Sequence, residues 1–147
     1  MKNILVLIYL LPALCFSQNQ GSAILNDEDY KKYEKEALEL YSSKEYNNYN
    51  TSMNDFSIGL GKADFDFGDV DFKKWLDKNF EKTNFKSKEE AVFLYERFSV
   101  SATEKLLNRI RDINKDAYSL RLKYGTDIFE DAFKKILEQA LKPTTNF

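Results

Sequence analysis

Histidine is missing from the 147 residues of this chain, and cysteine occurs once, as Cys15. Without histidine, neither a Ser-His-Asp nor a Cys-His arrangement can activate a nucleophile. The lack of histidine and the single cysteine also exclude metal centres that need sets of His and Cys ligands, namely zinc, blue copper, haem iron and iron–sulfur centres. We therefore expect no cofactor of these kinds and no disulfide within the chain. Lysine, tyrosine, hydroxyl and carboxylate side chains remain as the reactive groups.

Long apolar runs are equally scarce, because residues 4–16 form the only one. That run is too short to cross a bilayer, which takes about 20 residues, but with Lys2 before it the run has the pattern of a signal peptide. The small side chains of Cys15 and Ser17 predict cleavage after Ser17, and the bulky Leu14 argues against lipidation of Cys15. The sequence thus predicts a bacterial chain that starts at Gln18 after export, in the periplasm or outside the cell.

Neither sign of charge is in marked excess, since 22 basic residues stand against 24 acidic ones in a mixed order. The absence of a basic stripe argues against nucleic acid as a partner. No apolar stretch after residue 17 is long enough to span a bilayer, so we expect no membrane insertion of the processed chain. Its length suits one domain. We place that domain at residues 26–142, after a flexible lead-in at 18–25 and before a tail at 143–147.

Apolar residues recur every three or four positions over most of this domain, which predicts an all-α fold, a bundle of four to five helices. The first predicted helix is capped by Asn26, has Leu25 packed against Tyr30, and fades near Tyr46. We expect three of its tyrosines to form its buried stripe, namely Tyr30, Tyr33 and Tyr41. A short second helix, capped by Asp69 or Asp71, is predicted to end near Phe80.

A third helical stretch opens with a capping box of Ser87 and Glu90 and carries an apolar stripe as far as Tyr124. The pattern fits either one long helix or two helices with a break at residues 99–101, where Ser101 and Glu104 would form a second capping box. Gly125 is expected to end whichever helix reaches it. A last helix is predicted from residue 127 to a stop at Pro143.

Residues 47–68 break this periodicity. Asn and Ser residues dominate positions 47–55 and favour a loop, because their side chains compete with the helix for backbone hydrogen bonds. Apolar residues then alternate with small or acidic ones, which predicts a short hairpin-like or irregular insert over residues 56–68. The glycines Gly59 and Gly61 weaken the interpretation as strands.

Four aspartates close together form a weak calcium candidate, because calcium prefers clustered carboxylate oxygens; they are Asp64, Asp66, Asp69 and Asp71. The EF-hand pattern is not met, since Trp75 stands where that loop closes with glutamate. The aspartates equally fit a solvent-facing side and helix caps, so no metal is assigned. The segment Gly59-Leu60-Gly61-Lys62 completes neither phosphate-binding pattern.

Four residues in and around the irregular segment are the candidates for partner contact: Tyr46, Tyr49, Lys62 and Phe65. Tyrosine offers apolar area and a hydroxyl at low entropic cost, and binding residues are common on loops carried by a rigid scaffold. Phe65 equally fits a place in the core. The absence of a completed catalytic motif favours a binding module that acts by protein contact, as an inhibitor, an adaptor or an immunity-like factor.

Two other functions fit the same composition. A pair of carboxylates could hydrolyse a cell-envelope polysaccharide without histidine, although no spacing among the 24 acidic residues marks a pair. A calcium-binding envelope protein is the second alternative. Neither the partner nor the oligomeric state follows from the sequence.

Overall fold

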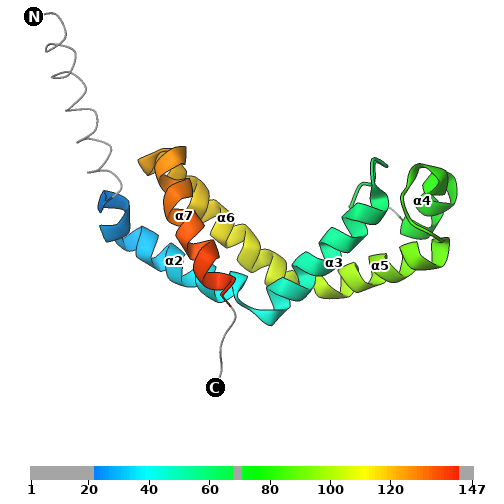
Figure 1. The fold of residues 1–147 in the computed structure, drawn as a ribbon, viewed down its shortest axis with the longest axis horizontal. Coiled ribbons are helices and arrows are strands. Elements are labelled where there is room, and N and C mark those ends of the chain that lie inside the picture. The colour runs from blue at the N-terminus through cyan, green and yellow to red at the C-terminus, as the bar shows by residue number, and fades with distance from the viewer. Residues whose placement is uncertain (1–21, 68–70, 143–147) are drawn as a thin grey trace, which may run out of the picture. The chain divides into compact units, whose positions relative to one another are not determined.

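The computed structural model describes residues 22–67 and 71–142 (Figure 1). Every regular element within these ranges is helical, which confirms the predicted all-α fold. The elements are α2 (Glu28–Tyr41), α3 (Lys44–Leu60), α4 (Phe72–Asn79), the 3-10 helix η1 (Phe80–Lys82), α5 (Lys88–Ser101), α6 (Glu104–Tyr124) and α7 (Thr126–Ala140). The predicted signal peptide and the tail at 143–147 lie outside the described residues. Among the described helices, none combines the length and the apolar character that a membrane span needs.

Contacts between residues divide the chain into two compact units. Unit 1 combines the chain up to Ser42 with the chain from Arg109 onward, and unit 2 is the continuous stretch from Ser43 to Asn108. Unit 1 therefore contains α2, most of α6 and α7, and unit 2 contains α3, α4, η1, α5 and the start of α6. The single domain over residues 26–142 stays a prediction, and each of the two units has buried apolar residues of its own.

In unit 1, α2 packs against α7. Tyr30 and Tyr33 are almost fully buried, as the sequence predicted, and Tyr41 is half-buried. The Tyr33 ring lies 5.5 Å from that of Phe129, and the Tyr30 hydroxyl donates to the backbone carbonyl of Ala132 over 3.3 Å. Burial raises the pKa of Tyr30 to about 12. A tyrosine is tolerated at such a depth because its hydroxyl has a partner.

The beginning of unit 1 differs from the prediction in three respects. Residues 22–26 are helical rather than a flexible lead-in, because Ile24 is buried in the core. Asp27, not Asn26, caps α2, and its carboxylate accepts from the backbone N–H groups of Asp29 and Tyr30 over 2.7 and 3.1 Å. Leu25, predicted to pack against Tyr30, is exposed, since the helical turn directs Ile24 inward in its place.

In unit 2, α3 replaces the loop predicted at residues 47–55 and the first five residues of the insert predicted at 56–68. Ser43 caps this helix by accepting from the backbone N–H of Tyr46 over 3.1 Å. Residues 63–66 have neither helix nor strand, so no hairpin forms among the described residues of this segment. The physical reason is that Phe56 and Leu60 anchor the helix in the core, and tertiary packing outweighs the low helix propensity of Asn and Ser.

The Phe56 ring is the centre of the unit 2 core and is fully buried. Five aromatic rings surround it with centroids at 5.3 to 6.0 Å: Phe65, Phe72, Phe85, Tyr95 and Phe98. These rings come from the segment after α3, from α4, from the segment before α5, and from α5 itself. Figure 1 shows α3 and α5 side by side, with α4 at the far end of the pair.

The caps predicted for α4 and α5 are present. Asp71 accepts from the backbone N–H groups of Lys73 and Lys74 over 3.1 and 3.3 Å. Ser87 accepts from the N–H of Glu90 over 3.1 Å, and the Glu90 carboxylate accepts from the N–H of Lys86 over 2.6 Å. The Ser87 half of the predicted capping box is thus confirmed, whereas the return bond goes to the residue before the cap.

The stretch from residue 88 to 124 forms two helices, which decides between the two alternatives. Ser101 ends α5 and its hydroxyl donates to the carbonyl of Phe98, so the second capping box predicted on Ser101 is wrong. Thr103 caps the start of α6 instead, since its hydroxyl accepts from the N–H of Leu106 over 3.3 Å. Gly125 separates α6 from α7 with φ +87°, a backbone conformation that favours glycine.

Candidate functional site

The exposed side of α3 carries almost no charge, which distinguishes it from the other long helices. Three of its 17 residues are charged, namely Lys44, Glu45 and Asp55. In the 14-residue helix α2, by contrast, eight are charged: Glu28, Asp29, Lys31, Lys32, Glu34, Lys35, Glu36 and Glu39. A solvated helix face normally carries charged residues. The exposed side of α3 is therefore unlike an ordinary solvent-facing surface.

Four exposed residues form one stripe along α3, because they are spaced three and four positions apart; they are Asn47, Asn50, Asn54 and Ser57. We refer to this stripe as the amide face. Asn and Ser are poorer helix formers than the Ala, Glu, Lys or Arg that could stand at exposed positions. Their presence lowers the stability of α3 and is not explained by folding. Positions that break a local folding rule without a structural gain are candidates for function.

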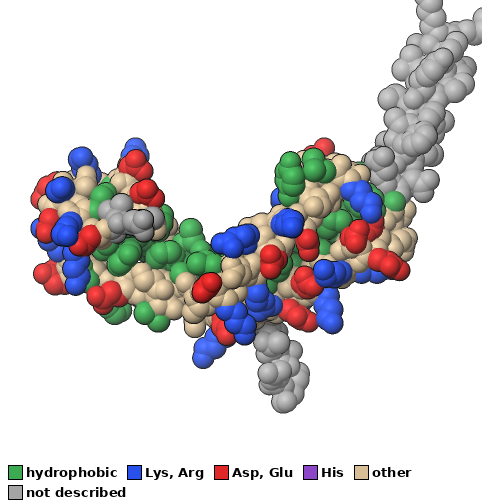
Figure 2. Space-filling view, turned by 180° about the vertical axis from the view of Figure 1, so that it is seen from behind, with side chains coloured by type: hydrophobic (Ala, Val, Ile, Leu, Met, Phe, Trp, Pro, Cys, Tyr) green, Lys and Arg blue, Asp and Glu red, His purple; other side chains and the backbone are tan. Residues whose placement is uncertain are grey.

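An apolar area borders the amide face, and we call it the aromatic edge; it consists of Tyr49, Met53, Phe67 and Phe98. The Phe98 ring lies 6.0 Å from Tyr49 and 5.6 Å from Phe67. Phe67 leaves 52 % of its surface exposed although it also packs on Phe56 at 6.1 Å. Figure 2 shows hydrophobic side chains open to solvent on this unit. Half-exposed rings held on a rigid core are typical anchors of protein interfaces.

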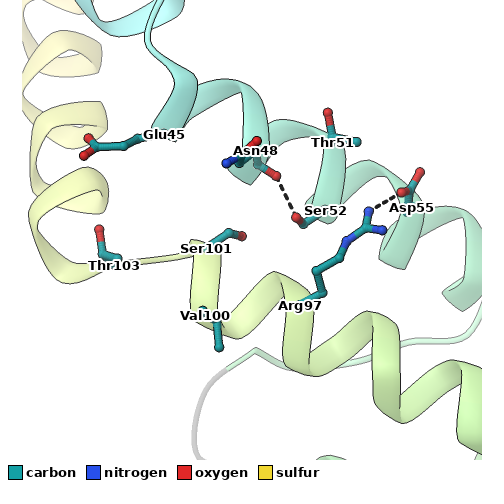
Figure 3. A pocket seen from close by; sticks show the side chains of 9 residues that line it. All are labelled: Glu45, Asn48, Thr51, Ser52, Asp55, Arg97, Val100, Ser101 and Thr103. Carbon is teal, nitrogen blue, oxygen red and sulfur yellow. Dashed lines mark hydrogen bonds and ion pairs between the residues drawn. The ribbon is translucent and has the colours of Figure 1, made fainter.

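A polar groove is lined by other residues of α3 and α5 and by the turn into α6 (Figure 3). It has a volume of about 630 Å³. Its walls carry Glu45, Asn48, Thr51, Ser52, Asp55, Arg97, Val100, Ser101 and Thr103. Asp55 and Arg97 form an ion pair across it, and the buried Ser52 hydroxyl donates to the carbonyl of Asn48 over 2.6 Å.

The groove does not have the geometry of a glycoside hydrolase. Its two carboxylates belong to Glu45 and Asp55, which lie at opposite ends of the lining in Figure 3. Ten helical positions separate them by about 15 Å of rise, whereas such enzymes hold their carboxyl groups about 5 to 9.5 Å apart. Asp55 is moreover engaged by Arg97. The groove therefore gives the hydrolase alternative no catalytic pair.

The four predicted contact residues have different environments. Tyr46 and Tyr49 lie on α3 rather than in a loop, and both are half-buried. Burial, and to a lesser extent the neighbouring Tyr49, raises the pKa of Tyr46. Lys62 is exposed just after the helix. Phe65 is buried in the unit 2 core, so its place among the contact candidates is wrong, and its neighbour Phe67 is exposed in its stead.

The predicted calcium candidates do not form a cluster in the described part of the chain. Asp71 is used as the cap of α4, and hydrogen bonds from the backbone N–H and the side chain of Lys74 lower its pKa. At Asp64 it is the backbone carbonyl that is engaged, by the Trp75 indole N–H over 3.1 Å. Asp69 lies outside the described residues. Among the described residues, no three acidic, His or Cys side chains come together as a metal site would require.

The glycines of the Gly59-Leu60-Gly61-Lys62 segment have structural roles. Gly59 lies against the ring of Phe85, and Gly61 ends α3 with φ +63°. Asn84 then covers this helix end, since its backbone N–H donates to the carbonyl of Gly59 over 2.7 Å and its side chain to that of Ile58 over 3.2 Å. The segment therefore terminates a helix and does not form a phosphate-binding loop.

The amide face could not be recognised from the sequence, because its residues are typical of loops. One signal could have revealed the helix: Tyr49, Met53, Phe56 and Leu60 stand at helical spacing, four, three and four residues apart. The alternation of Phe56, Ile58 and Leu60 concealed it.

Comparison with known proteins identifies no relative: no family model, no curated protein and no solved structure matches the chain significantly.

Proposed function

We propose that this chain is an exported binding module that acts by contacting another protein through α3. The observation that carries the proposal is the charge-free amide face beside the half-exposed rings of the aromatic edge. Interface cores are depleted in Lys, Glu and Asp and enriched in aromatic residues and Met. Tyr, Asn and Ser also dominate the binding loops of antibodies, where they combine rigid contact area with adaptable hydrogen bonding. The α3 surface has the same composition.

The proposal keeps the roles that the sequence favours, those of an inhibitor, an adaptor or an immunity-like factor. Each of them needs a surface that binds and no reaction centre. The hydrolase alternative has weaker support, because the groove separates its two carboxylates. The calcium alternative has weaker support, because Asp71 already caps a helix.

Site-specific photo-crosslinking tests this proposal. The photoreactive p-benzoylphenylalanine would replace Phe67 in one variant and Phe93 in the other, and the source cells would be irradiated. Phe93 is the matched control, since it is a 60 % exposed phenylalanine of the same unit on α5. It lines a shallow depression with four charged residues, Lys73, Lys88, Glu89 and Glu96. We expect discrete adducts from position 67 and none from position 93, with the crosslinked chain identified by mass spectrometry.

A second variant shows whether the amide face belongs to the same surface. Asn54→Lys in the chain with the photoreactive group at position 67 should reduce the adduct by about tenfold, because an unpaired charge becomes buried at the contact. Equal adducts from positions 67 and 93, or an adduct that Asn54→Lys leaves unchanged, would refute the proposed surface.

A further inference from the structure

The amide face can meet an identical copy of itself without electrostatic repulsion. In a two-fold symmetric interface each surface patch faces the same patch on the second copy, so a patch with net charge repels itself. The amide face contains no charged residue. Of the three charges on α3, Lys44 and Glu45 stand at its start and Asp55 pairs with Arg97 in the groove. The whole chain has a formal net charge of only −2, so its long-range self-repulsion is small.

Hydrogen bonding also favours a second copy of the chain as the partner of the amide face. Each asparagine amide carries both donors and an acceptor, and a serine hydroxyl does too. An asparagine can therefore satisfy an asparagine across an interface, which a row of carboxylates or ammonium groups cannot do. The midpoint of the amide face lies between Asn50 and Asn54. An antiparallel arrangement consequently places Asn50 opposite Asn54 of the second copy and Asn47 opposite its Ser57.

We propose that the chain forms a two-fold symmetric dimer in which α3 packs antiparallel on α3 of a second copy. This inference rests on the proposed function, because it names the first partner of the same surface. Met53, which lies between Asn50 and Asn54 on the same helix, and the exposed Phe67 of the aromatic edge supply the apolar area that the dimer buries. The amide pairs fix the register of the two helices.

Sedimentation equilibrium of the purified protein, expressed from its full-length gene, tests the dimer. The parent chain should dimerise with a Kd below about 100 µM, and this Kd should be nearly independent of salt because no charge is buried. In the double variant Asn50→Lys/Asn54→Lys, four ammonium groups meet at the interface. The Kd should rise by at least about tenfold, and high salt should recover part of that loss.

Two controls separate this effect from a loss of folding or from added charge. Lysine is a better helix former than asparagine, so the double variant should melt no lower than the parent monomer. The variant Asn114→Lys/Ser119→Lys adds the same charge at two exposed positions of α6 and should dimerise like the parent.

Charge complementation makes the test specific for α3 against α3. Asn50→Glu/Asn54→Glu should be monomeric alone, as the two-lysine variant is, and an equimolar mixture of the two should form heterodimers. A parent chain that stays monomeric at about 100 µM, or a two-lysine variant that dimerises as well as the parent, overturns the inference. If the parent is monomeric while position 67 crosslinks a different protein, the dimer fails and the proposed function stands. If the parent dimerises as described and position 67 crosslinks only to a second copy, the dimer stands and the contact with a different protein fails instead.

Discussion

Gly59 of α3 lies so close to the ring of Phe85 that a β-carbon on the glycine would stand 1.9 Å from Cε1 of the phenylalanine. Phe85 is itself buried, with its ring 5.8 Å from that of Phe56. The helix end and the segment before α5 are thus fitted to each other at a position where only a hydrogen atom has room.

Gly59→Ala should destabilise the protein by about 1–3 kcal/mol, since overpacking a core exceeds the gain of about 1 kcal/mol that alanine brings to a helix. Urea denaturation measures the change. Adding Phe85→Leu should recover part of the loss and give a non-zero coupling energy in a double-mutant cycle. Ser57→Ala, two residues earlier on the exposed side, is the control. Additive effects of Gly59→Ala and Phe85→Leu would show that the two side chains do not constrain each other.

Phe65→Ala should cost about 3–5 kcal/mol, because it removes a buried ring that contacts Phe56, Phe72 and Trp75. Lys62→Ala, at an exposed position three residues earlier, should change the unfolding free energy by less than about 0.5 kcal/mol. Both values come from urea denaturation of the purified variants. A Phe65→Ala variant as stable as the parent would return this ring to the list of contact residues.

Acid should weaken the junction between the start of α2 and the end of α6. Hydrogen bonds from the Lys123 ammonium and the Tyr124 hydroxyl lower the pKa of Asp27 well below its usual range. A depressed carboxyl pKa stabilises the fold above the unfolded pKa, about 3.9, and this contribution is lost as the pH falls below it.

Asp27→Asn tests that contribution, because asparagine still caps a helix but cannot carry the charge. The melting temperature of the variant should lie below that of the parent at pH 6, and the difference should shrink as the pH is lowered past about 4. Asp131→Asn removes one exposed carboxyl of α7 and is the control. A difference between parent and Asp27→Asn that is constant from pH 6 to pH 2 would contradict the charged role of Asp27.

Replacing the three asparagines of the amide face by alanine should stabilise the monomer. Each of Asn47→Ala, Asn50→Ala and Asn54→Ala gains about 0.5 kcal/mol of helix propensity, and the triple variant should melt about 5 °C higher than the parent. The comparison is made at a concentration where the parent is monomeric. The same variant should lose crosslinking from position 67, as expected when function and stability conflict. A triple variant of lower stability would mean that these amides hold the fold.

The predicted export signal can be tested by the mass of the processed protein. We expect a chain that begins at Gln18, alone or less one ammonia after cyclisation of that glutamine. Intact-mass spectrometry of the protein recovered from the source cells distinguishes this product from an uncut chain. A product that retains a lipidated Cys15 would instead make the protein membrane-anchored.

Most of the helix boundaries could be predicted from the sequence because their signals are local. Three of these signals act within one turn of the chain and are present in the structure: the Ser87 cap with Glu90, the Asp71 cap of α4, and Gly125 after α6. The first cap was misplaced by one residue, from Asn26 to Asp27. That error has a distant cause, since Lys123 and Tyr124, almost a hundred residues later, bind the Asp27 carboxylate.

The candidate site was only partly predictable. Tyr49 is predicted as a contact residue because of its side-chain type, and it belongs to the aromatic edge. For the phenylalanines the prediction selects Phe65, whereas the exposed ring is that of Phe67. Alternation along the chain gives both phenylalanines the same weight. Which ring enters the core depends on Trp75 and Tyr95, whose rings lie 5.0 and 6.1 Å from Phe65.

The sequence by itself determined the helical class, the burial of Tyr30 and Tyr33 in α2, and the exclusion of sites that need histidine. The first two properties depend on periodicity and capping, which act at short range along the chain. The third depends on composition alone. Only the tertiary structure decided that residues 47–60 are a helix. Their own propensities favour a loop, and the helix is stable because Phe56 is held by rings 9 to 42 positions further along the chain. That long-range packing is what turns a polar, asparagine-rich stretch into a rigid, charge-free surface.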